Sequence, residues 1–200
     1  MFKLKANFDD EELEFDDVGF GSPSLNFYKG GRFYIGGAFD ESIQTNIVPH
    51  LFDDIAKKQG LIEAKIQFII NSPGGATNVL KDLLSLIDIA KGSGIVVETL
   101  VFGNAYSCGS LLAVSGTKGF RMVGRHAEHL CHLGAAGNVS KNEEDLKRFT
   151  ARTKMHFDFI KSIYKDNCNI PNLDEVIHND NFFVRGRNLV KFGLADRIIG

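Results

Sequence analysis

The chain has 200 residues, of which 44% are hydrophobic, and a formal net charge of −2 at pH 7. This length allows one sizeable hydrophobic core, and scattered lysines with a near-neutral net charge form no basic face, which argues against a nucleic acid partner. Because no apolar stretch approaches the roughly 20 residues that span a bilayer, we expect no membrane contact and a cytoplasmic location.

The beginning of the chain is dominated by acidic side chains. Seven carboxylates lie between Asp9 and Asp17, with only Leu13 and Phe15 as apolar residues among them. Such a segment repels itself and buries little surface. We therefore expect an acidic N-terminal arm over residues 1–30, followed by one folded domain over residues 31–200.

From Gly31 onward, segments with the periods of strands and helices alternate. Strands are predicted over residues 32–36, 65–70 and 95–102, and helices over residues 41–58, after Gly75 and from Ser107 onward. The helix after Gly75 carries Val79, Leu83, Leu84, Ile87 and Ile89. Nearly continuous apolar strands separated by helices indicate an α/β fold with a largely parallel sheet covered by helices.

The second half of the domain contains a long helix. Short strands are predicted over residues 120–123 and 129–132, followed by a helix of about seven turns over residues 142–166. Its second half spreads apolar residues over roughly 200° of the helical wheel, wider than one core-facing stripe. These residues are Met155, Phe157, Phe159, Ile160, Ile163 and Tyr164. One domain is not expected to cover this surface, so the helix predicts a subunit interface.

Ser107 stands where the strand over residues 95–102 leads into a helix. It follows Gly103 in the stretch Gly103-Asn-Ala-Tyr-Ser-Cys-Gly-Ser110. A serine at this place is commonly an N-cap that satisfies backbone N–H groups. It can also be a nucleophile, because unpaired N–H groups at the start of a helix suit a developing oxyanion. Ligands of parallel sheets bind beyond the carboxyl ends of the strands, where the turn Asn71-Ser-Pro-Gly-Gly75 and Ser107 both fall.

Serine catalysis also needs a base that accepts the hydroxyl proton and an acid that orients this base. The candidates are His132, at the end of a short strand, and Asp180, in a polar loop before the last helix. Each has an ordinary alternative, as a polar residue at a strand end and as a helix cap. Sequence order alone does not establish that they meet Ser107.

A metal site is the competing interpretation. The segment His126-Ala-Glu-His-Leu-Cys-His132 holds three histidines, a carboxylate and a thiol. Its spacing does not match His-Glu-x-x-His, and on a strand His129 points away from the other two histidines. We therefore expect no metal. The cysteines Cys108, Cys131 and Cys168 are odd in number without short spacing, which indicates reduced thiols.

Five motifs in one order carry a family resemblance. They are Asn71-Ser-Pro-Gly-Gly75, Ser107 within Gly-x-x-x-Ser-x-Gly, His132, Asp180-Asn-Phe182 and Phe192-Gly-Leu-Ala-Asp196. From about Gly31 to its end, the chain resembles the ClpP family, the proteolytic subunit of Clp proteases. The resemblance implies a ClpP/crotonase-like fold of repeated β-β-α and βα units, in which the long helix is a protruding handle.

The resemblance also implies the function and the site. It implies a serine endopeptidase with a Ser107–His132–Asp180 triad, an oxyanion hole from the backbone N–H groups of Gly75 and Cys108, and neither metal nor cofactor. The substrates would be peptides or unfolded proteins. The protein would be a homo-oligomer in which seven-membered rings stack in pairs around a closed chamber.

The chain departs from the family at several positions. Cys108 replaces the usual Met after the nucleophile, Leu133-Gly134 replaces Gln-Pro, and His178-Asn179 replaces an acidic–basic pair. The axial loops that help dock an AAA+ unfoldase are not recognisable in residues 1–28, so this partner stays open. Such divergence resembles a phage-encoded or otherwise specialised member. Two rival functions are a non-catalytic structural subunit and a crotonase-type acyl-CoA enzyme.

Overall fold

The computed structural model describes residues 26–134, 142–179 and 181–200. The predicted acidic arm lies outside the described residues up to residue 25. Residues 26–29, which we assigned to the end of that arm, form a strand that pairs antiparallel with the next one. The sheet therefore includes residues that precede Gly31.

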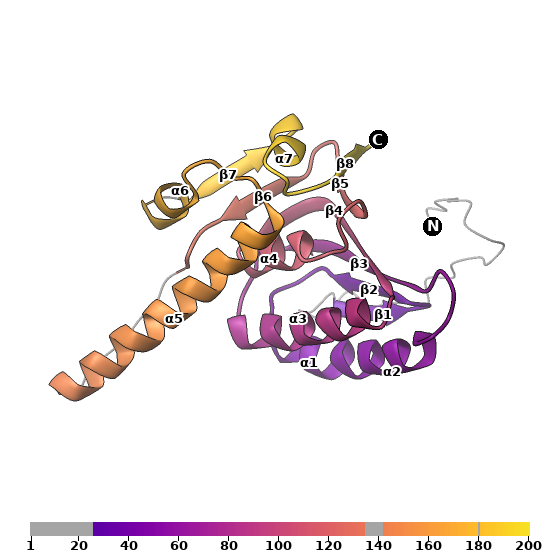
Figure 1. The fold of residues 1–200 in the computed structure, drawn as a ribbon, viewed down its shortest axis with the longest axis horizontal. Helices are drawn as coiled ribbons and strands as arrows, with labels where there is room; N and C mark the ends of the chain where they lie inside the picture. Colours follow the sequence, from indigo (N-terminus) through magenta and orange to yellow (C-terminus); the bar gives the residue numbers. More distant parts are fainter. Residues whose placement is uncertain (1–25, 135–141, 180) are drawn as a thin grey trace.

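The elements alternate along the chain as shown in Figure 1. The strands are β1 (Asn26–Lys29), β2 (Arg32–Ile35), β3 (Lys65–Ser72), β4 (Val96–Tyr106), β5 (Arg121–Gly124), β6 (Glu128–Cys131), β7 (Phe182–Arg185) and β8 (Arg197–Ile199). The helices are α1 (Glu41–Asn46), α2 (Val48–Lys58), α3 (Thr77–Gly92), α4 (Cys108–Val114), α5 (Glu143–Asn167), α6 (Leu173–Asn179) and α7 (Arg187–Lys191).

The strands form one mainly parallel sheet, which confirms the predicted α/β class. Its order is β1-β2-β3-β4-β5-β8, with β6 and β7 attached beside this path. The pairs β1–β2 and β6–β7 are antiparallel, and the others are parallel. This arrangement agrees with the fold that the family resemblance implies.

Strand β4 changes its partner along its length. Residues 99–101 pair with β5, whereas residues 104–106 pair with β6. The β6–β7 hairpin therefore leaves the main sheet beside the end of β4. Because β6 ends at Cys131, this branching brings His132 to the same end of the sheet as Ser107.

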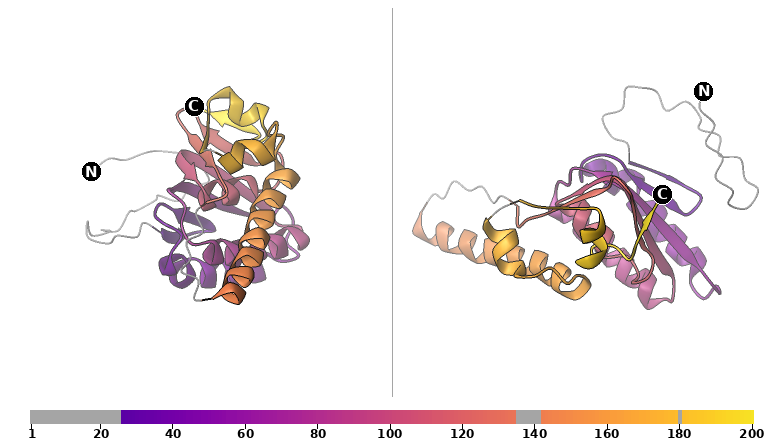
Figure 2. Two further views of the ribbon diagram at one scale, coloured as in Figure 1. Left: turned by 90° about the vertical axis from the view of Figure 1, so that its left-hand side faces the viewer. Right: turned by 90° about the horizontal axis from the view of Figure 1, so that it is seen from above.

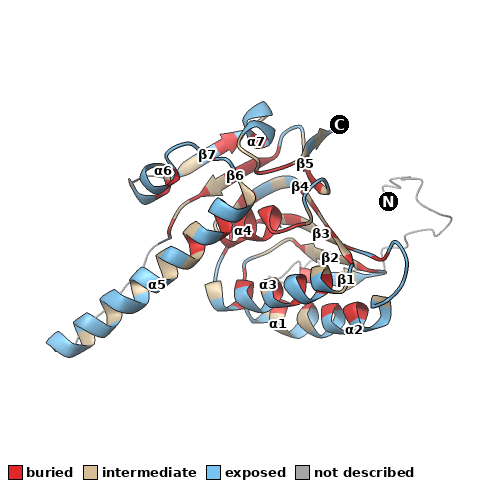
Figure 3. Cartoon of the chain, viewed as in Figure 1, coloured by how far each residue is buried: buried red, intermediate tan, exposed pale blue. Residues whose placement is uncertain are grey.

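Helices cover one face of the sheet. Along this face α2 contacts α3, α3 contacts α4 and α4 contacts α5. All seven residues of α4 are buried, which makes it the most enclosed of these helices (Figure 3). The burial of β3 alternates, so that Phe68 and Ile70 are buried while their neighbours are half-buried. The other face is thus covered less than the apolar strands suggested.

Two details of the helices differ from the predictions. The helix predicted over residues 41–58 is divided into α1 and α2 at Ile47, because Pro49 lacks an N–H group and favours the start of a new helix. In α3, Ile89 is 52% exposed, since Ile87 and Ala90 occupy the core-facing side. The other four apolar residues predicted for α3 are buried or pack against the core.

Helix α5 protrudes from the body of the molecule (Figures 1 and 2). It has 25 residues, and its first turn is capped by the Asn142 side chain, which accepts a hydrogen bond from the N–H of Asp145 at 2.9 Å. Only Ile160, Ile163 and Tyr164 are buried, all near its base. The apolar face is therefore covered there, but Met155 is 71% exposed further out. No helix in the described ranges has the length and apolar composition that crossing a membrane requires.

Candidate active site

Ser107 occupies a strained turn between β4 and α4. Its φ of 53° and ψ of −119° lie in a region that residues with a side chain rarely adopt. The turn is held because the N–H of Ser107 donates to the carbonyl oxygen of Leu130 at 2.9 Å. The Ser107 side chain makes no capping hydrogen bond to α4. The helix-cap interpretation is therefore not supported, and Ser107 is a half-buried residue whose hydroxyl does not cap α4.

The turn after β3 lies directly against Ser107, as the positions of the two motifs predicted. A side chain at Gly74 would place its Cβ 2.7 Å from the Cβ of Ser107 and 2.6 Å from the carbonyl oxygen of Tyr106. The φ of Gly74 is also positive, at 92°. Only glycine permits this approach, so Gly74 is required for the contact between the two turns.

Hydrogen bonds fix the shape of the turn after β3. The N–H of Gly74 donates to Ser72 Oγ at 3.1 Å, and the N–H of Phe39 donates to the carbonyl oxygen of Gly74 at 2.9 Å. A Cβ at Gly75 would lie 2.7 Å from the backbone nitrogen and oxygen of Phe39. The turn is thus clamped between the segment at Phe39 and the start of α4.

The backbone N–H groups of Gly75 and Cys108 lie in the two turns that meet at Ser107. The Cys108 thiol donates to the carbonyl oxygen of Gly75, with Sγ and O 3.2 Å apart, and so joins the two residues. Burial raises the pKa of this thiol, which therefore stays protonated near neutral pH.

His132 follows β6 and is half-buried. Its Nδ1 lies 3.2 Å from Oδ1 of Asn181, and the N–H of Leu133 donates to the carbonyl oxygen of Ile177 at 3.2 Å. His132 Nε2 is buried and has no hydrogen-bond partner within the described ranges. The ring is thus oriented from its Nδ1 side, and Nε2 makes no hydrogen bond to Ser107.

Asp180, the third residue predicted for the site, lies outside the described residues. The residue beside it, Asn181, was not singled out in the sequence, although it belongs to the motif Asp180-Asn-Phe182. Ser107 and His132 lie on neighbouring segments of the fold. The backbone N–H of Ser107 donates to the carbonyl oxygen of Leu130, which is two residues before His132.

The histidine cluster is dispersed. His126 is exposed, whereas His129 is fully buried and lies 3.0 Å from Ser110 Oγ through its Nδ1. Within the described part of the chain, no group of three His, Cys, Asp or Glu side chains is placed to hold a metal ion. Cys108, Cys131 and Cys168 are free thiols.

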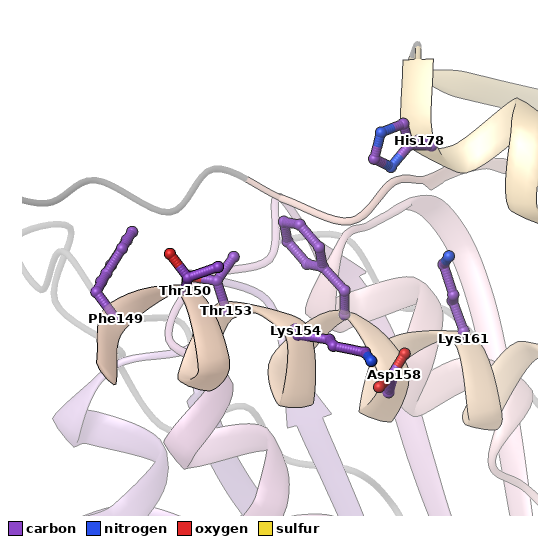
Figure 4. Close-up of a pocket in the computed structure, with 8 residues that line it drawn as sticks. Phe149, Thr150, Thr153, Lys154, Asp158, Lys161 and His178 are labelled. Atoms are coloured by element: carbon purple, nitrogen blue, oxygen red, sulfur yellow. The ribbon is translucent and has the colours of Figure 1, made fainter. Parts of the chain in front are cut away.

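A cavity of about 410 Å³ lies along α5 and is lined by neither Ser107 nor His132. Figure 4 shows side chains of α5 along one side of it and His178 of α6 opposite. The lining residues are Phe149, Thr150, Thr153, Lys154, Phe157, Asp158, Lys161 and His178. This cavity belongs to the protruding helix and contains none of the residues predicted for catalysis.

Comparison with known proteins finds similarity to one family over most of the chain. The model of the Clp protease family matches residues 24–200. The ATP-dependent Clp protease proteolytic subunit of Deinococcus radiodurans is 27% identical over 191 residues, covering 92% of this chain and 89% of that protein. Subunit 2 of the ATP-dependent Clp protease of Chlamydia trachomatis serovar D is 25% identical over 190 residues, covering 92% and 90%.

Proposed function

Because the chain belongs to the Clp protease family, we propose that it is a serine endopeptidase in which Ser107 attacks the peptide bond. The observation that carries this proposal is the strained turn at Ser107, packed against Gly74 with its hydroxyl free of any capping bond. Backbone strain of this kind is kept where the surrounding structure needs it, commonly at active sites.

In the proposed mechanism His132 acts first as a base and then as an acid. Its Nε2 accepts the Ser107 proton during attack and later gives it to the leaving amine. An acceptor at Nδ1 favours the tautomer in which Nδ1 carries the proton and Nε2 is an acceptor, and Asn181 Oδ1 supplies such an acceptor. Hydrogen bonds between nucleophile and base often tighten only when substrate binds. Asp180 is the proposed carboxylate that stabilises the imidazolium.

The proposed oxyanion hole consists of the N–H groups of Gly75 and Cys108. Attack on the peptide carbonyl places negative charge on its oxygen, and two preorganised N–H donors stabilise this charge without reorganisation. The position of Gly75 in the clamped turn and of Cys108 directly after Ser107 supports this role. The mechanism requires neither metal nor cofactor.

We further propose that the substrates are peptides or unfolded polypeptides and that the protein works as stacked seven-membered rings. The support is the family resemblance together with the protruding α5, whose Met155 is 71% exposed. The cavity beside Phe157 offers an apolar surface to a neighbouring subunit (Figure 4). The relatives are named ATP-dependent. For this chain, we propose hydrolysis of short peptides without ATP and leave its unfoldase partner unassigned.

Fluorophosphonate labelling tests the proposal. The wild-type protein should be labelled at Ser107, and Ser107→Ala should lose both labelling and peptide hydrolysis, the latter by several orders of magnitude. Ser115→Ala is the matched control, because this hydroxyl donates back to the end of its own helix, to the carbonyl oxygen of Leu111 at 2.7 Å. Its labelling should match that of wild type.

Two other outcomes identify the rival functions. A correctly assembled wild-type protein without labelling or peptidase activity would indicate a non-catalytic subunit, and thioester hydrolysis alone would favour a crotonase-type enzyme. Activity that EDTA removes and zinc restores would favour the histidine cluster.

A further inference from the structure

Two polar side chains are fully enclosed behind the proposed site. Ser110 in α4 and His129 in β6 are both 0% exposed. Ser110 Oγ lies 3.0 Å from His129 Nδ1 and 3.6 Å from Cys131 Sγ. Because the pair is enclosed, substrate does not reach it. Its hydroxyl and imidazole therefore act within the fold and do not contact substrate.

The pair connects the same two segments as the proposed catalytic residues. Ser110 follows Ser107 by three residues, so it lies within the first turn of α4. His129 precedes His132 by three residues along the segment of β6. The hydrogen bond between Ser110 and His129 therefore joins the two segments that carry Ser107 and His132, and a shift of α4 along β6 would change both separations.

The hydrogen bond between Ser110 and His129 sets the direction in which α4 packs on β6. Burial of an imidazole is costly unless it is hydrogen-bonded, and His129 Nε2 has no partner among the described residues. Ser110 is thus the polar group that compensates this ring. Burial, with a smaller effect of Arg121, lowers the pKa of His129 to about 3, so the ring is neutral at working pH. In either neutral tautomer, Nδ1 and the hydroxyl form one bond.

Apolar contacts alone would hold α4 on β6 with less directional control. Dispersion and hydrophobic burial are not directional, whereas a hydrogen bond restricts both distance and angle. The N–H of Ser107 bonds to the carbonyl oxygen of Leu130 at 2.9 Å, which fixes the beginning of α4 at one point. The Ser110–His129 bond supplies a second point one turn further on, and two points define an orientation.

We propose that Ser110 and His129 are positioning residues whose hydrogen bond sets the alignment of Ser107 with His132. The proposal rests on the proposed function, because the alignment matters only if Ser107 and His132 react together. It predicts that loss of the bond lowers the rate of the chemical step without changing substrate affinity.

The test compares four variants by kcat, KM and the rate of fluorophosphonate labelling, each per folded molecule. Ser110→Ala and His129→Leu remove the bond and should lower kcat and labelling about tenfold with KM unchanged. His129→Asn keeps a polar group at the place of Nδ1 and should restore most of the rate. Ser115→Ala, at the other end of α4, should behave as wild type.

The double variant Ser110→Ala/His129→Leu gives a further measurement. Because both substitutions remove the same hydrogen bond, the double variant should lose no more activity than either single variant. If His129→Leu does not fold, the comparison of Ser110→Ala with Ser115→Ala decides.

Two results separate failure of this inference from failure of the proposed function. If wild type is active but Ser110→Ala keeps the kcat of Ser115→Ala, the positioning role is wrong and the triad stands. If wild type shows neither labelling nor peptidase activity, the proposed function is wrong and the positioning role falls with it.

Discussion

The imidazole of His132 faces the amide of Asn181, with Nδ1 and Oδ1 3.2 Å apart. In a serine triad this side of the ring faces a carboxylate, which both selects the tautomer and stabilises the imidazolium. An amide oxygen also selects the tautomer, but it stabilises the imidazolium only weakly because it carries no net charge. The roles proposed for the neighbouring residues Asp180 and Asn181 can therefore be separated by mutation.

Adjacent substitutions distinguish these two residues. Asp180→Asn should lower kcat strongly, by up to about 10⁴-fold, because the charge that stabilises the imidazolium is lost. Asn181→Ala should cost less than about tenfold, the effect of one neutral hydrogen bond. Steady-state peptide hydrolysis measures both. The opposite ranking would assign the orienting role to Asn181 and remove Asp180 from the triad.

The buried His129 should make the protein sensitive to mild acid. Its pKa is about 3 in the folded state, against an ordinary value of 6.5, chiefly because of burial. Between these values the unfolded chain binds the extra proton, so the free energy of unfolding falls as pH falls, by up to ~1.4 kcal/mol per pH unit. Above pH 6.5 the imidazole is neutral in both states, so the free energy of unfolding no longer depends on its titration. Arg121 also disfavours the proton, and the Cys131 thiol, with a pKa of about 11, stays neutral.

Urea unfolding at pH 7.5 and pH 5 measures this effect. Wild type should lose more stability over the interval than His129→Asn, which has no group titrating there. Ser115→Ala should lose as much as wild type, because its hydroxyl does not titrate. Identical losses for wild type and His129→Asn would show that the ring is protonated in the folded protein.

The sequence predicted the elements whose signals are local. The strand that leads into Ser107 and the glycine turn after β3 were recognisable from apolar runs and turn residues, and parallel strands bring their ends together. The division of the predicted helix at Ile47 was also recognisable in principle, because Pro49 is a helix-start signal. These features depend on residues that are close in the chain.

The remaining site features depend on contacts between distant segments. The Ser110–His129 bond joins residues 19 positions apart and the His132–Asn181 bond joins residues 49 apart. His129 was considered only as a metal ligand, and no partner was predicted for Ser110. The register of α4 on β6 and the branching of β4 decide these contacts, and neither follows from local periodicity.

The exposed part of α5 should be needed for assembly. Phe157 is half-buried and lines the cavity on α5, so Phe157→Glu would place a charge on the proposed apolar subunit interface, which is costly to bury. Light scattering should show smaller species and peptide hydrolysis should fall. Ser162→Glu is the control, since this residue is exposed in the same helix and does not line the cavity. A wild-type protein that is monomeric at micromolar concentration would contradict the interface.

The last motif of the resemblance should contribute to stability through Asp196. Its carboxylate receives two hydrogen bonds from the Arg121 side chain, from Nη2 at 2.6 Å and from Nε at 3.0 Å. The N–H groups of Gly119 and Arg121 also donate to it, at 2.6 Å and 2.9 Å. Burial alone would raise the pKa of Asp196, but these bonds and the Arg121 charge lower it below its usual value. The pair therefore fixes the segment before β8 to the start of β5.

Asp196→Asn should lower the free energy of unfolding by about 3 kcal/mol, because the Arg121 side chain, only 5% exposed, is left without its counter-charge. Asp53→Asn is the matched control. Asp53 pairs with Lys57, but their side chains are 58% and 68% exposed, so this change should cost much less than Asp196→Asn. The Asp196 contribution is present above the unfolded pKa and should be lost as pH falls through the lowered folded pKa. Thermal unfolding at pH 7 with equal costs for the two variants would show that the Arg121–Asp196 pair does not stabilise the fold.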